Sequence, residues 1–290
     1  MKPLTLHLID LSVPGGSITR HEPDETLVRV DDLGITRGDG IFEVAAVLHG
    51  TPLALEAHLA RFARSARMLD LPEPDLDLWR RAVGAAAADM ADQPGLTAVK
   101  FIMTRGIEGA ASAPTGWALG FLADDPAPAQ AEGLDVVLLD RGYRHDVADT
   151  SPWLLAGAKT LAYAINKAAL REAERRGADD VIFISSDGYV LEGPSSTLIA
   201  RIDGTYITPP VSLGILPGTT QGDVFADLER QGVPTRVDTL SVNDLETAGA
   251  MWLCSSTRGA APIRTLDGRR ITVDHRATEL INTGLDARRQ

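Results

Sequence analysis

A ten-residue stretch near the middle of the chain divides the sequence into two parts. Residues 124–133 read Asp-Asp-Pro-Ala-Pro-Ala-Gln-Ala-Glu-Gly, so they offer no core-forming side chain larger than alanine, and the two prolines stiffen the stretch. A chain of 290 residues is also long enough for two domains. We therefore expect a smaller N-terminal domain over residues 1–123, an interdomain linker over 124–133 and a larger C-terminal domain over 134–290.

Two kinds of periodicity alternate along both parts. Alternation of apolar and polar residues predicts strands, and apolar residues three or four positions apart predict helices. The predicted strands cover residues 4–9, 26–30, 41–48, 97–104, 117–123, 134–139, 180–185, 197–202 and 250–255. The predicted helices cover residues 55–71, 76–91, 160–176 and 220–231. The fold class predicted from this mixture is α/β, with an α+β domain in the first part.

Acidic residues outnumber basic ones, which excludes several classes of partner. Forty Asp and Glu against 28 Lys and Arg give a net charge of -12, so the chain repels nucleic-acid backbones and anionic lipid headgroups. The apolar N-terminal segment is interrupted at Asp10, too early for a signal sequence, and no apolar run approaches the roughly 18 residues of a membrane span. We expect a cytoplasmic protein that acts on a small molecule, with no nucleic-acid or membrane partner.

Several common catalytic motifs are missing from the sequence. It contains no closely spaced Cys or His ligands for a metal and no Gly-x-Ser-x-Gly motif, which argues against metal-dependent and serine hydrolysis. The single cysteine, Cys254, lies in the apolar run 251–254 and is expected to be a small buried side chain rather than a nucleophile.

Lysine is scarce, which limits any chemistry that requires an amine. The chain has only Lys2, Lys100, Lys159 and Lys167. Lys159 follows the apolar and small residues 154–158 and precedes a predicted helix. Partial desolvation and the positive helix end would lower the pKa of its amine and make it a better nucleophile. The alternative is a lysine that extends from a helix start into solvent. Lys167 shares a helix face with other charged residues and is expected to be solvated.

Three further positions suit an anionic, aromatic ligand. Glu192 follows a short apolar segment and precedes a turn of small residues, so it could face a protonated ring nitrogen, or it could be a surface acid. Thr219 and Thr220 open a predicted helix, which suits a phosphate group but also suits an ordinary helix start. Arg61 lies on an apolar helix face, where its charge requires an anion, unless it lies at the edge of that face. Together with Lys159, these residues match the needs of pyridoxal 5'-phosphate.

The order of these motifs resembles the fold-type IV pyridoxal-phosphate enzymes. This family comprises branched-chain aminotransferases, D-amino-acid aminotransferases and 4-amino-4-deoxychorismate lyases. The resemblance runs from about Asp31 to Ile271. It rests on Gly-Asp-Gly-Ile-Phe-Glu at 38–43, Glu-Ala-His-Leu-Ala-Arg-Phe at 56–62, Lys-Thr-Leu-Ala-Tyr at 159–163, Leu-Glu-Gly-Pro-Ser-Ser at 191–196, Gly-Thr-Thr at 218–220 and Ser-Ser-Thr-Arg at 255–258.

The resemblance implies a role for each matching residue. Lys159 would bind the cofactor covalently and carry the proton, and Glu192 would pair with the pyridine nitrogen. The remaining cofactor contacts would be Arg61, Thr219, Thr220 and Ser256 at the phosphate, Tyr163 at the phenolic oxygen and Ser195 beside the ring. The resemblance also implies two α/β domains with the cofactor at their interface, the larger C-terminal one binding most of it, and a homodimer.

The reaction is less well defined than the cofactor. We expect a lyase that releases pyruvate and 4-aminobenzoate for folate biosynthesis, because residues 104–111 lack the Arg-x-His pair of well-known D-amino-acid aminotransferases. The alternatives are a D-amino-acid or branched-chain aminotransferase and, as a minor one, a non-catalytic binding protein. Tyr163 argues somewhat against the lyase, since the best-known lyases have Asn-Arg where this chain has Ala162-Tyr163. Ala162, Thr197 and Thr219 each depart from the residue common in the family. Candidates for binding a substrate carboxylate are Arg37, Arg105, Arg144 and Arg258.

Overall fold

The computed structural model describes residues 3–109 and 113–287. The chain forms two compact units. The N-terminal unit comprises Met1–Asp125 together with Ala158–Tyr163, and the C-terminal unit comprises Pro126–Gly157 together with Ala164–Gln290. The short segment that contains Lys159 therefore groups with the N-terminal unit, although the residues on both sides of it belong to the C-terminal one.

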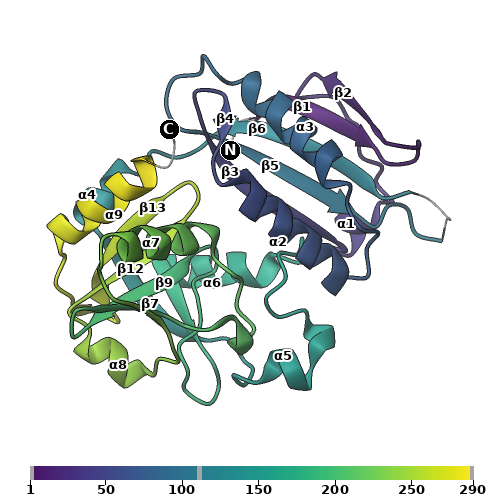
Figure 1. Cartoon of the computed structure of the whole chain (residues 1–290). Helices are drawn as coiled ribbons and strands as arrows, with labels where there is room; N and C mark the ends of the chain where they lie inside the picture. The colour runs from purple at the N-terminus through teal and green to yellow at the C-terminus, as the bar shows by residue number, and fades with distance from the viewer. Residues whose placement is uncertain (1–2, 110–112, 288–290) are drawn as a thin grey trace. The chain divides into compact units, whose positions relative to one another are not determined.

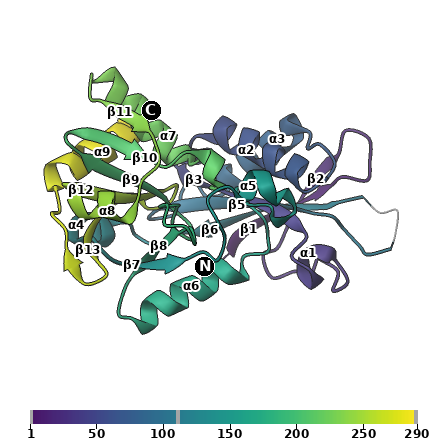
Figure 2. The ribbon, with the colours of Figure 1, turned by 90° about the horizontal axis from the view of Figure 1, so that it is seen from below.

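The N-terminal unit is built on an antiparallel sheet with strand order β2-β1-β6-β5-β3-β4. Its strands are β1 (Pro3–Asp10), β2 (Ser17–His21), β3 (Gly40–Leu48), β4 (Thr51–Pro52), β5 (Thr97–Thr104) and β6 (Thr115–Leu122). Its helices are α1 (Leu33–Thr36), α2 (Leu55–Met68) and α3 (Leu76–Ala88). Helices α2 and α3 lie side by side over one face of the sheet (Figures 1 and 2).

The core of this unit follows from the predicted patterns. Phe62 of α2 packs its ring 4.8 Å from that of Trp79 of α3 and 5.0 Å from that of Phe101 of β5. Aromatic pairs at such distances add to the free energy of burial. The helices predicted at 55–71 and 76–91 are confirmed, each ending three residues earlier than expected.

The strand predicted at 26–30 is wrong. Residues 26–30 form no strand, and Val30 is 83% exposed. The edge strand β2 lies at Ser17–His21 instead, where mostly exposed side chains give little apolar signal and pairing with β1 supplies the hydrogen bonds.

The C-terminal unit contains a mixed sheet with strand order β11-β10-β9-β12-β13-β7-β8, and β14 pairs with β13. Its strands are β7 (Leu134–Asp140), β8 (Asp180–Ile184), β9 (Thr197–Ile202), β10 (Thr205–Thr208), β11 (Thr235–Val237), β12 (Ala250–Ser255), β13 (Gly259–Leu266) and β14 (Arg269–Arg270). Its helices are α4 (Ala127–Glu132), α5 (Val147–Thr150), α6 (Ala164–Arg175), α7 (Thr219–Arg230), α8 (Val242–Thr247) and α9 (His275–Ala287), with short 3₁₀ turns at Pro152–Leu154 and Val211–Leu213.

Strand alternation gives this sheet two apolar faces. Met251 and Leu253 of β12 point into one cluster, whereas Trp252 and Cys254 point into another. The second cluster is completed by side chains of α7 and α9, which lie side by side (Figure 1). A strand that is buried on both faces needs apolar residues at every position, which explains why residues 250–254 are all apolar. The mixed α/β fold with two sheets is confirmed.

Two segments differ from the sequence-based expectation. The helix predicted at 160–176 begins only at Ala164, because residues 159–161 pair with β3 instead. The segment 124–133 contains the short helix α4. No helix within residues 3–109 and 113–287 is long and apolar enough to cross a bilayer.

Candidate functional site

Lys159 is held in an extended segment against the first residues of β3. Its carbonyl accepts a hydrogen bond from the amide of Phe42 at 3.0 Å, and its own amide donates to Ser65 Oγ of α2 at 3.1 Å. Thr160 bridges Ile41 of β3 in antiparallel fashion. The helix therefore does not begin at Lys159, and the expected effect of a positive helix end on its amine is wrong.

The ring of Phe42 lies beside the amine of Lys159. Lys159 Nζ lies 4.7 Å from the ring centroid, and so does Nζ of Lys100 from β5. Tyr163 packs edge-to-face on the same ring, with centroids 5.5 Å apart and an interplanar angle of 88°. Phe42 thus brings together three side chains that carry polar groups, two of which the resemblance assigned to the cofactor.

Arg61 lies in a buried cluster of polar side chains on α2 and β3. Its Nε and Nη2 donate to the two carboxylate oxygens of Glu43 at 2.7 Å each, and Nδ1 of His58 lies 2.8 Å from Glu43 Oε2. Glu43 is 0%, His58 1% and Arg61 8% exposed. The anion that the sequence required for an inward-facing Arg61 is therefore a protein carboxylate, held in a bidentate pair.

Burial and charge set the protonation of this cluster. Burial alone would raise the pKa of Glu43, but the charge and hydrogen bonds of Arg61, with the hydrogen bond to His58, outweigh it and lower the pKa to about 2. Burial lowers the pKa of His58, against the opposing effect of Glu43. At neutral pH Glu43 is therefore ionised and His58 is neutral.

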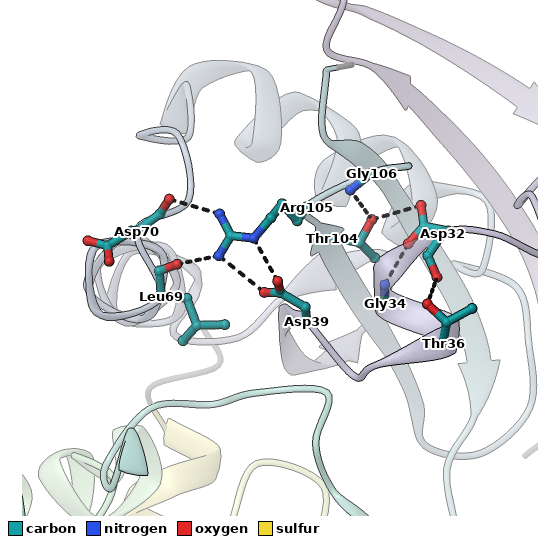
Figure 3. Close-up of polar contacts among 9 residues, drawn as sticks. All are labelled: Asp32, Gly34, Thr36, Asp39, Leu69, Asp70, Thr104, Arg105 and Gly106. Atoms are coloured by element: carbon teal, nitrogen blue, oxygen red, sulfur yellow. Dashed lines mark hydrogen bonds and ion pairs between the residues drawn. The ribbon is translucent and has the colours of Figure 1, made fainter. Parts of the chain in front are cut away.

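The Gly-Asp-Gly motif at residues 38–40 lets the Lys159 segment approach β3. Gly38 has a φ of +68°, and a Cβ there would lie 3.1 Å from the backbone of Ala162. Asp39 is paired with Arg105, whose guanidinium also donates to the carbonyl oxygens of Leu69 and Asp70 at the end of α2 (Figure 3). All three nitrogens of Arg105 are thus bound to protein groups, which favours a structural role over substrate binding.

Glu192 lies in the C-terminal unit, on a segment fixed by backbone hydrogen bonds. The amide of Phe183 donates to the carbonyl of Glu192 at 2.9 Å, and the amide of Leu191 donates back to Phe183 at 2.8 Å. The carboxylate itself accepts from the amide of Leu216 at 3.1 Å. This places a half-buried carboxylate at the end of an apolar segment, as the sequence predicts for a partner of a ring nitrogen.

Two side chains missed by the sequence analysis support the turn after Glu192. Nδ2 of Asn166, in the first turn of α6, donates to the carbonyl of Pro194 at 2.6 Å, and its Oδ1 accepts from Nη2 of Arg141 at 3.2 Å. The Arg141 guanidinium lies 4.5 Å from the centroid of the Phe183 ring. Its Nη1 is buried without a hydrogen-bond partner among the described residues.

Strand β12 and the turn before α7 converge on Thr197, the first residue of β9. Thr197 pairs with Cys254 of β12, two residues before Ser256, and a Cβ on Gly218 would lie 2.3 Å from Thr197 Oγ1. The preceding Ser196 is 6% exposed, and its Oγ has no hydrogen-bond partner in the part of the chain that the structure describes. The predicted Ser195, in contrast, is exposed.

The start of α7 at this convergence has the properties of an anion site. Gly218 caps the helix without a side-chain hydrogen bond, and Thr219 and Thr220 are its first residues. First-turn amides and hydroxyl groups suit a phosphate ester. With the Glu192 carboxylate in the same unit, this donor set fits the phosphate and the ring nitrogen of pyridoxal phosphate.

The turn that carries Ser256 is fixed by an ion pair. Nη1 of Arg258 lies 2.6 Å from Oδ2 of Asp180, which is 0% exposed. Of the other arginines considered for a substrate carboxylate, Arg144 lies near two aspartates and Arg37 is exposed. Ala110 and Ala111 of the stretch 104–111 lie outside the described residues.

Each predicted site residue falls into one of the two units. The N-terminal unit holds Arg61, Lys159 and Tyr163, and the C-terminal unit holds Glu192, Ser195, Thr219, Thr220 and Ser256. Cys254 is 2% exposed, and burial raises the pKa of its thiol to about 12, so it is not a nucleophile. Glu43 and His58 were not predicted as partners of Arg61, although a glutamate inside the apolar run 41–48 was a signal for a buried partner.

Comparison with known proteins agrees with this donor set. Residues 40–266 match the family profile described as amino-transferase class IV. A Mycobacterium tuberculosis protein named bifunctional aminodeoxychorismate lyase / D-amino acid transaminase is 45% identical over 266 residues, covering 86% of this chain and 89% of that protein.

Solved structures extend the likeness to nearly the whole chain. The fold IV-transaminase CpuTA1 from Curtobacterium pusillum has a TM-score of 0.93 at 50% identity, covering 98% of this chain and 97% of that one. A hypothetical aminotransferase from Mycobacterium tuberculosis in its PLP-bound form has a TM-score of 0.90 at 41% identity, covering 98% of this chain and 99% of that one. The chain therefore belongs to the class IV aminotransferase family and is a pyridoxal-phosphate-dependent enzyme.

Proposed function

We propose that the enzyme is a 4-amino-4-deoxychorismate lyase that releases pyruvate and 4-aminobenzoate, a step of folate biosynthesis. The observation that carries this proposal is the 45% identity to a relative whose name includes aminodeoxychorismate lyase. The structure adds a reason of its own. Arg105 lies in the stretch 104–111, where well-known D-amino-acid aminotransferases have the Arg-x-His pair, and its guanidinium is bound by Asp39 and by the end of α2.

Lys159 is proposed as the residue that binds the cofactor and moves the proton. Pyridoxal phosphate, when bound, supplies an electron sink for the negative charge that develops at the substrate carbon. Lys159 Nζ, as the free amine, accepts a proton from the substrate and returns it. The hydrogen bonds of the Lys159 backbone to the amide of Phe42 and to Ser65 Oγ fix the position of the Lys159 Cα, from which the side chain extends.

The remaining site residues are proposed to bind and orient the cofactor. Glu192, anchored by the amide of Leu216, would keep the pyridine nitrogen protonated. Thr219, Thr220 and Ser256 would bind the phosphate together with Arg61, whose guanidinium is oriented by Glu43. Tyr163 would bind the phenolic oxygen, and Ser195 would lie beside the ring.

A second candidate is D-amino-acid transamination by the same site. It is favoured by the second half of the relative's name, D-amino acid transaminase. Both reactions begin with removal of a proton beside the substrate nitrogen, so the same lysine serves both. A putative branched-chain-amino-acid aminotransferase from Methanocaldococcus jannaschii is 25% identical, so the branched-chain alternative has weaker support than these two reactions.

The two reactions are separated by assaying one preparation with both sets of substrates. Chorismate and glutamine, converted in place by an aminodeoxychorismate synthase, should yield 4-aminobenzoate, and Lys159→Ala should abolish it. Lys167→Ala, a change at an exposed lysine, is the control and should retain activity. Absence of 4-aminobenzoate, with keto acid formed from D-alanine and 2-oxoglutarate, would reject the lyase in favour of the transaminase.

We also propose that the enzyme is a cytoplasmic homodimer, as the family resemblance implies. Sedimentation equilibrium would then give twice the 30.9 kDa mass of one chain, and a monomer mass would refute it.

A further inference from the structure

The turn after Glu192 is held by two elements of the C-terminal unit, strand β8 and helix α6. The amide of Phe183 in β8 donates to the carbonyl of Glu192 at 2.9 Å, which fixes the chain before the turn. Nδ2 of Asn166 in α6 donates to the carbonyl of Pro194 at 2.6 Å. Proline has no N–H, so the carbonyl is the backbone group through which a hydrogen bond can hold this position. The direction in which the chain leaves Glu192 therefore depends on the Asn166 side chain.

Asn166 lies between a group that can only donate and a group that can only accept. Its Oδ1 accepts from Nη2 of Arg141 at 3.2 Å, and a guanidinium has no acceptor. The carbonyl of Pro194 has no donor, so Nδ2 faces it. A side-chain amide carries both groups on one short, planar frame, and Arg141 determines which of its two orientations is adopted. The opposite orientation would place donor against donor and acceptor against acceptor.

Arg141 is held by strand β8 and by its own loop. Its amide donates to the carbonyl of Ile184, the last residue of β8, at 2.8 Å, and its Nε donates to the hydroxyl of Tyr143 at 3.3 Å. The guanidinium lies 4.5 Å from the centroid of the Phe183 ring, a distance at which a cation and an aromatic ring attract each other. The same residue of β8 thus supports the guanidinium and, through its amide, the segment that carries Glu192.

The position of the Glu192 carboxylate can be followed through a hydrogen bond to another segment. Its Oε1 accepts from the amide of Leu216 at 3.1 Å, across 24 positions of the chain. This bond forms only when the turn presents the carboxylate in the right direction. Loss of the bond between Asn166 and Pro194 would allow the turn to move and would weaken the contact with Leu216.

We propose that Asn166, oriented by Arg141, is a positioning residue that aims the Glu192 carboxylate at the ring nitrogen of the cofactor. Arg141, Asn166, Pro194 and Glu192 all belong to the C-terminal unit. A carboxylate stabilises a protonated ring nitrogen only within hydrogen-bond reach, and the interaction weakens steeply as distance and angle depart from the optimum. The inference rests on the role proposed for Glu192 as the partner of that nitrogen.

Two substitutions of Asn166 separate the bond to Pro194 from side-chain packing. Asn166→Asp retains the size of the side chain and its pairing with Arg141, but an ionised carboxylate cannot donate to the Pro194 carbonyl. Asn166→Leu removes both hydrogen bonds at similar volume and changes no charge. Asn243→Asp and Asn243→Leu, at an exposed asparagine of α8, are the matched controls.

The first measurement follows backbone hydrogen exchange in the full chain after removal of the cofactor. We expect the amide of Leu216 to exchange about tenfold faster in both Asn166 variants, because a hydrogen bond of ordinary strength contributes a factor of this order. The amides of β12, in the centre of the C-terminal sheet, report global unfolding and should be accelerated much less.

These exchange rates distinguish a positioning role from a general loss of stability. Leu216 exchange that is unchanged in both Asn166 variants, or β12 exchange accelerated by the same factor as Leu216, overturns the proposal. Asn166→Asp also serves if Asn166→Leu does not fold. The two Asn243 variants should exchange at the rates of the unsubstituted chain.

Arg141→Met tests whether the guanidinium acts through Asn166. It should accelerate exchange at Leu216 in the otherwise unchanged chain, because the Asn166 amide loses the donor that orients it. Combined with Asn166→Leu, it should add nothing, since the contact through which it acts is already absent. Additive effects of the two substitutions would overturn the role of Arg141.

The second measurement uses the holoenzyme loaded with pyridoxal phosphate that carries ¹⁵N in its ring. The NMR signal of this nitrogen reports whether it is protonated. We expect the nitrogen to lose its proton at a pH about one unit lower in Asn166→Leu than in the unsubstituted enzyme, since a tenfold weaker pairing corresponds to about one pH unit. Asn243→Leu should leave that pH unchanged.

Glu192→Gln keeps this inference distinct from the proposed function. If the nitrogen of Glu192→Gln keeps its proton as the unsubstituted enzyme does, the role proposed for Glu192 is wrong, whereas exchange at Leu216 still tests the positioning by Asn166. If Glu192→Gln removes the proton and Asn166→Leu has no effect on it, the role of Glu192 is supported and the positioning proposal is refuted.

Discussion

Glu43 is the residue on which the buried cluster of the N-terminal unit depends. A carboxylate at 0% exposure is stable only when its charge is matched, and here Arg61 and His58 supply the matching donors within 2.8 Å. The Glu43 carboxylate also orients Arg61 through two parallel hydrogen bonds. Replacing a single atom of this cluster should therefore change both stability and cofactor binding.

The pH dependence of stability should report this cluster. The pKa of Glu43 is about 2 in the folded chain against an ordinary value of 4.5, so its stabilisation is complete above pH 4.5 and lost as the pH falls toward 2. The lowered pKa of His58 likewise removes stability as the pH falls below its ordinary value of 6.5. Thermal melts from neutral to acidic pH should show a falling midpoint, and His58→Gln should flatten the upper part of that fall.

Glu43→Gln tests the same cluster at neutral pH. It leaves Arg61 buried without its counter-ion, and we expect the free energy of unfolding to fall by about 3–5 kcal/mol. Urea denaturation measures this, with Glu56→Gln, which breaks an exposed ion pair to Arg80, as a control of much smaller effect. Equal losses in the two variants would show that the buried pair does not have the predicted importance.

At the scale of elements, the turn before β3 determines how closely the segment 159–163 can pack against that turn and the start of β3. Gly38→Ala places a Cβ 3.1 Å from the Ala162 backbone at a positive φ of +68°. We expect this variant to displace residues 159–163 and to weaken pyridoxal-phosphate binding about tenfold or more, since 1.4 kcal/mol corresponds to a factor of ten. Spectrophotometric titration with the cofactor measures the affinity.

Gly15→Ala is the matched control for that change. Gly15 has a similar φ of +76°, but a Cβ there meets nothing within 4 Å. The two variants share the conformational cost of a left-handed residue. Cofactor affinity reduced equally in both would mean that close packing against Ala162 does not position the Lys159 segment.

The elements also show how far the sequence could be interpreted. The bounds of strands and helices with a clear pattern of apolar residues, such as β5, β12 and α2, were predicted to within a few residues. Burial on one or two faces of an element determines where its apolar residues must lie. The predicted start of α6, at residue 160, was wrong because residues 159–161 form hydrogen bonds with β3. This is a tertiary contact, which the local spacing of apolar residues cannot reveal. The partners of Arg61 were missed for the same reason: Glu43 is 18 positions away.

At the scale of the whole molecule, the chain passes between its two units three times. After the first passage at residue 125, it returns to the N-terminal unit for residues 158–163 alone. Those six residues include Lys159 and Tyr163, whereas Glu192 and the start of α7 belong to the C-terminal unit. The site residues recognised from the sequence are therefore distributed over both units, each of which has its own sheet and core.

The most direct test of this account is to locate the lysine that carries the cofactor. Holoenzyme reduced with borohydride, digested and analysed by mass spectrometry should show one modified peptide with pyridoxyl phosphate at Lys159. The visible absorption of the unreduced enzyme should be lost in Lys159→Ala. Modification at Lys100, Lys167 or no lysine at all would contradict the account.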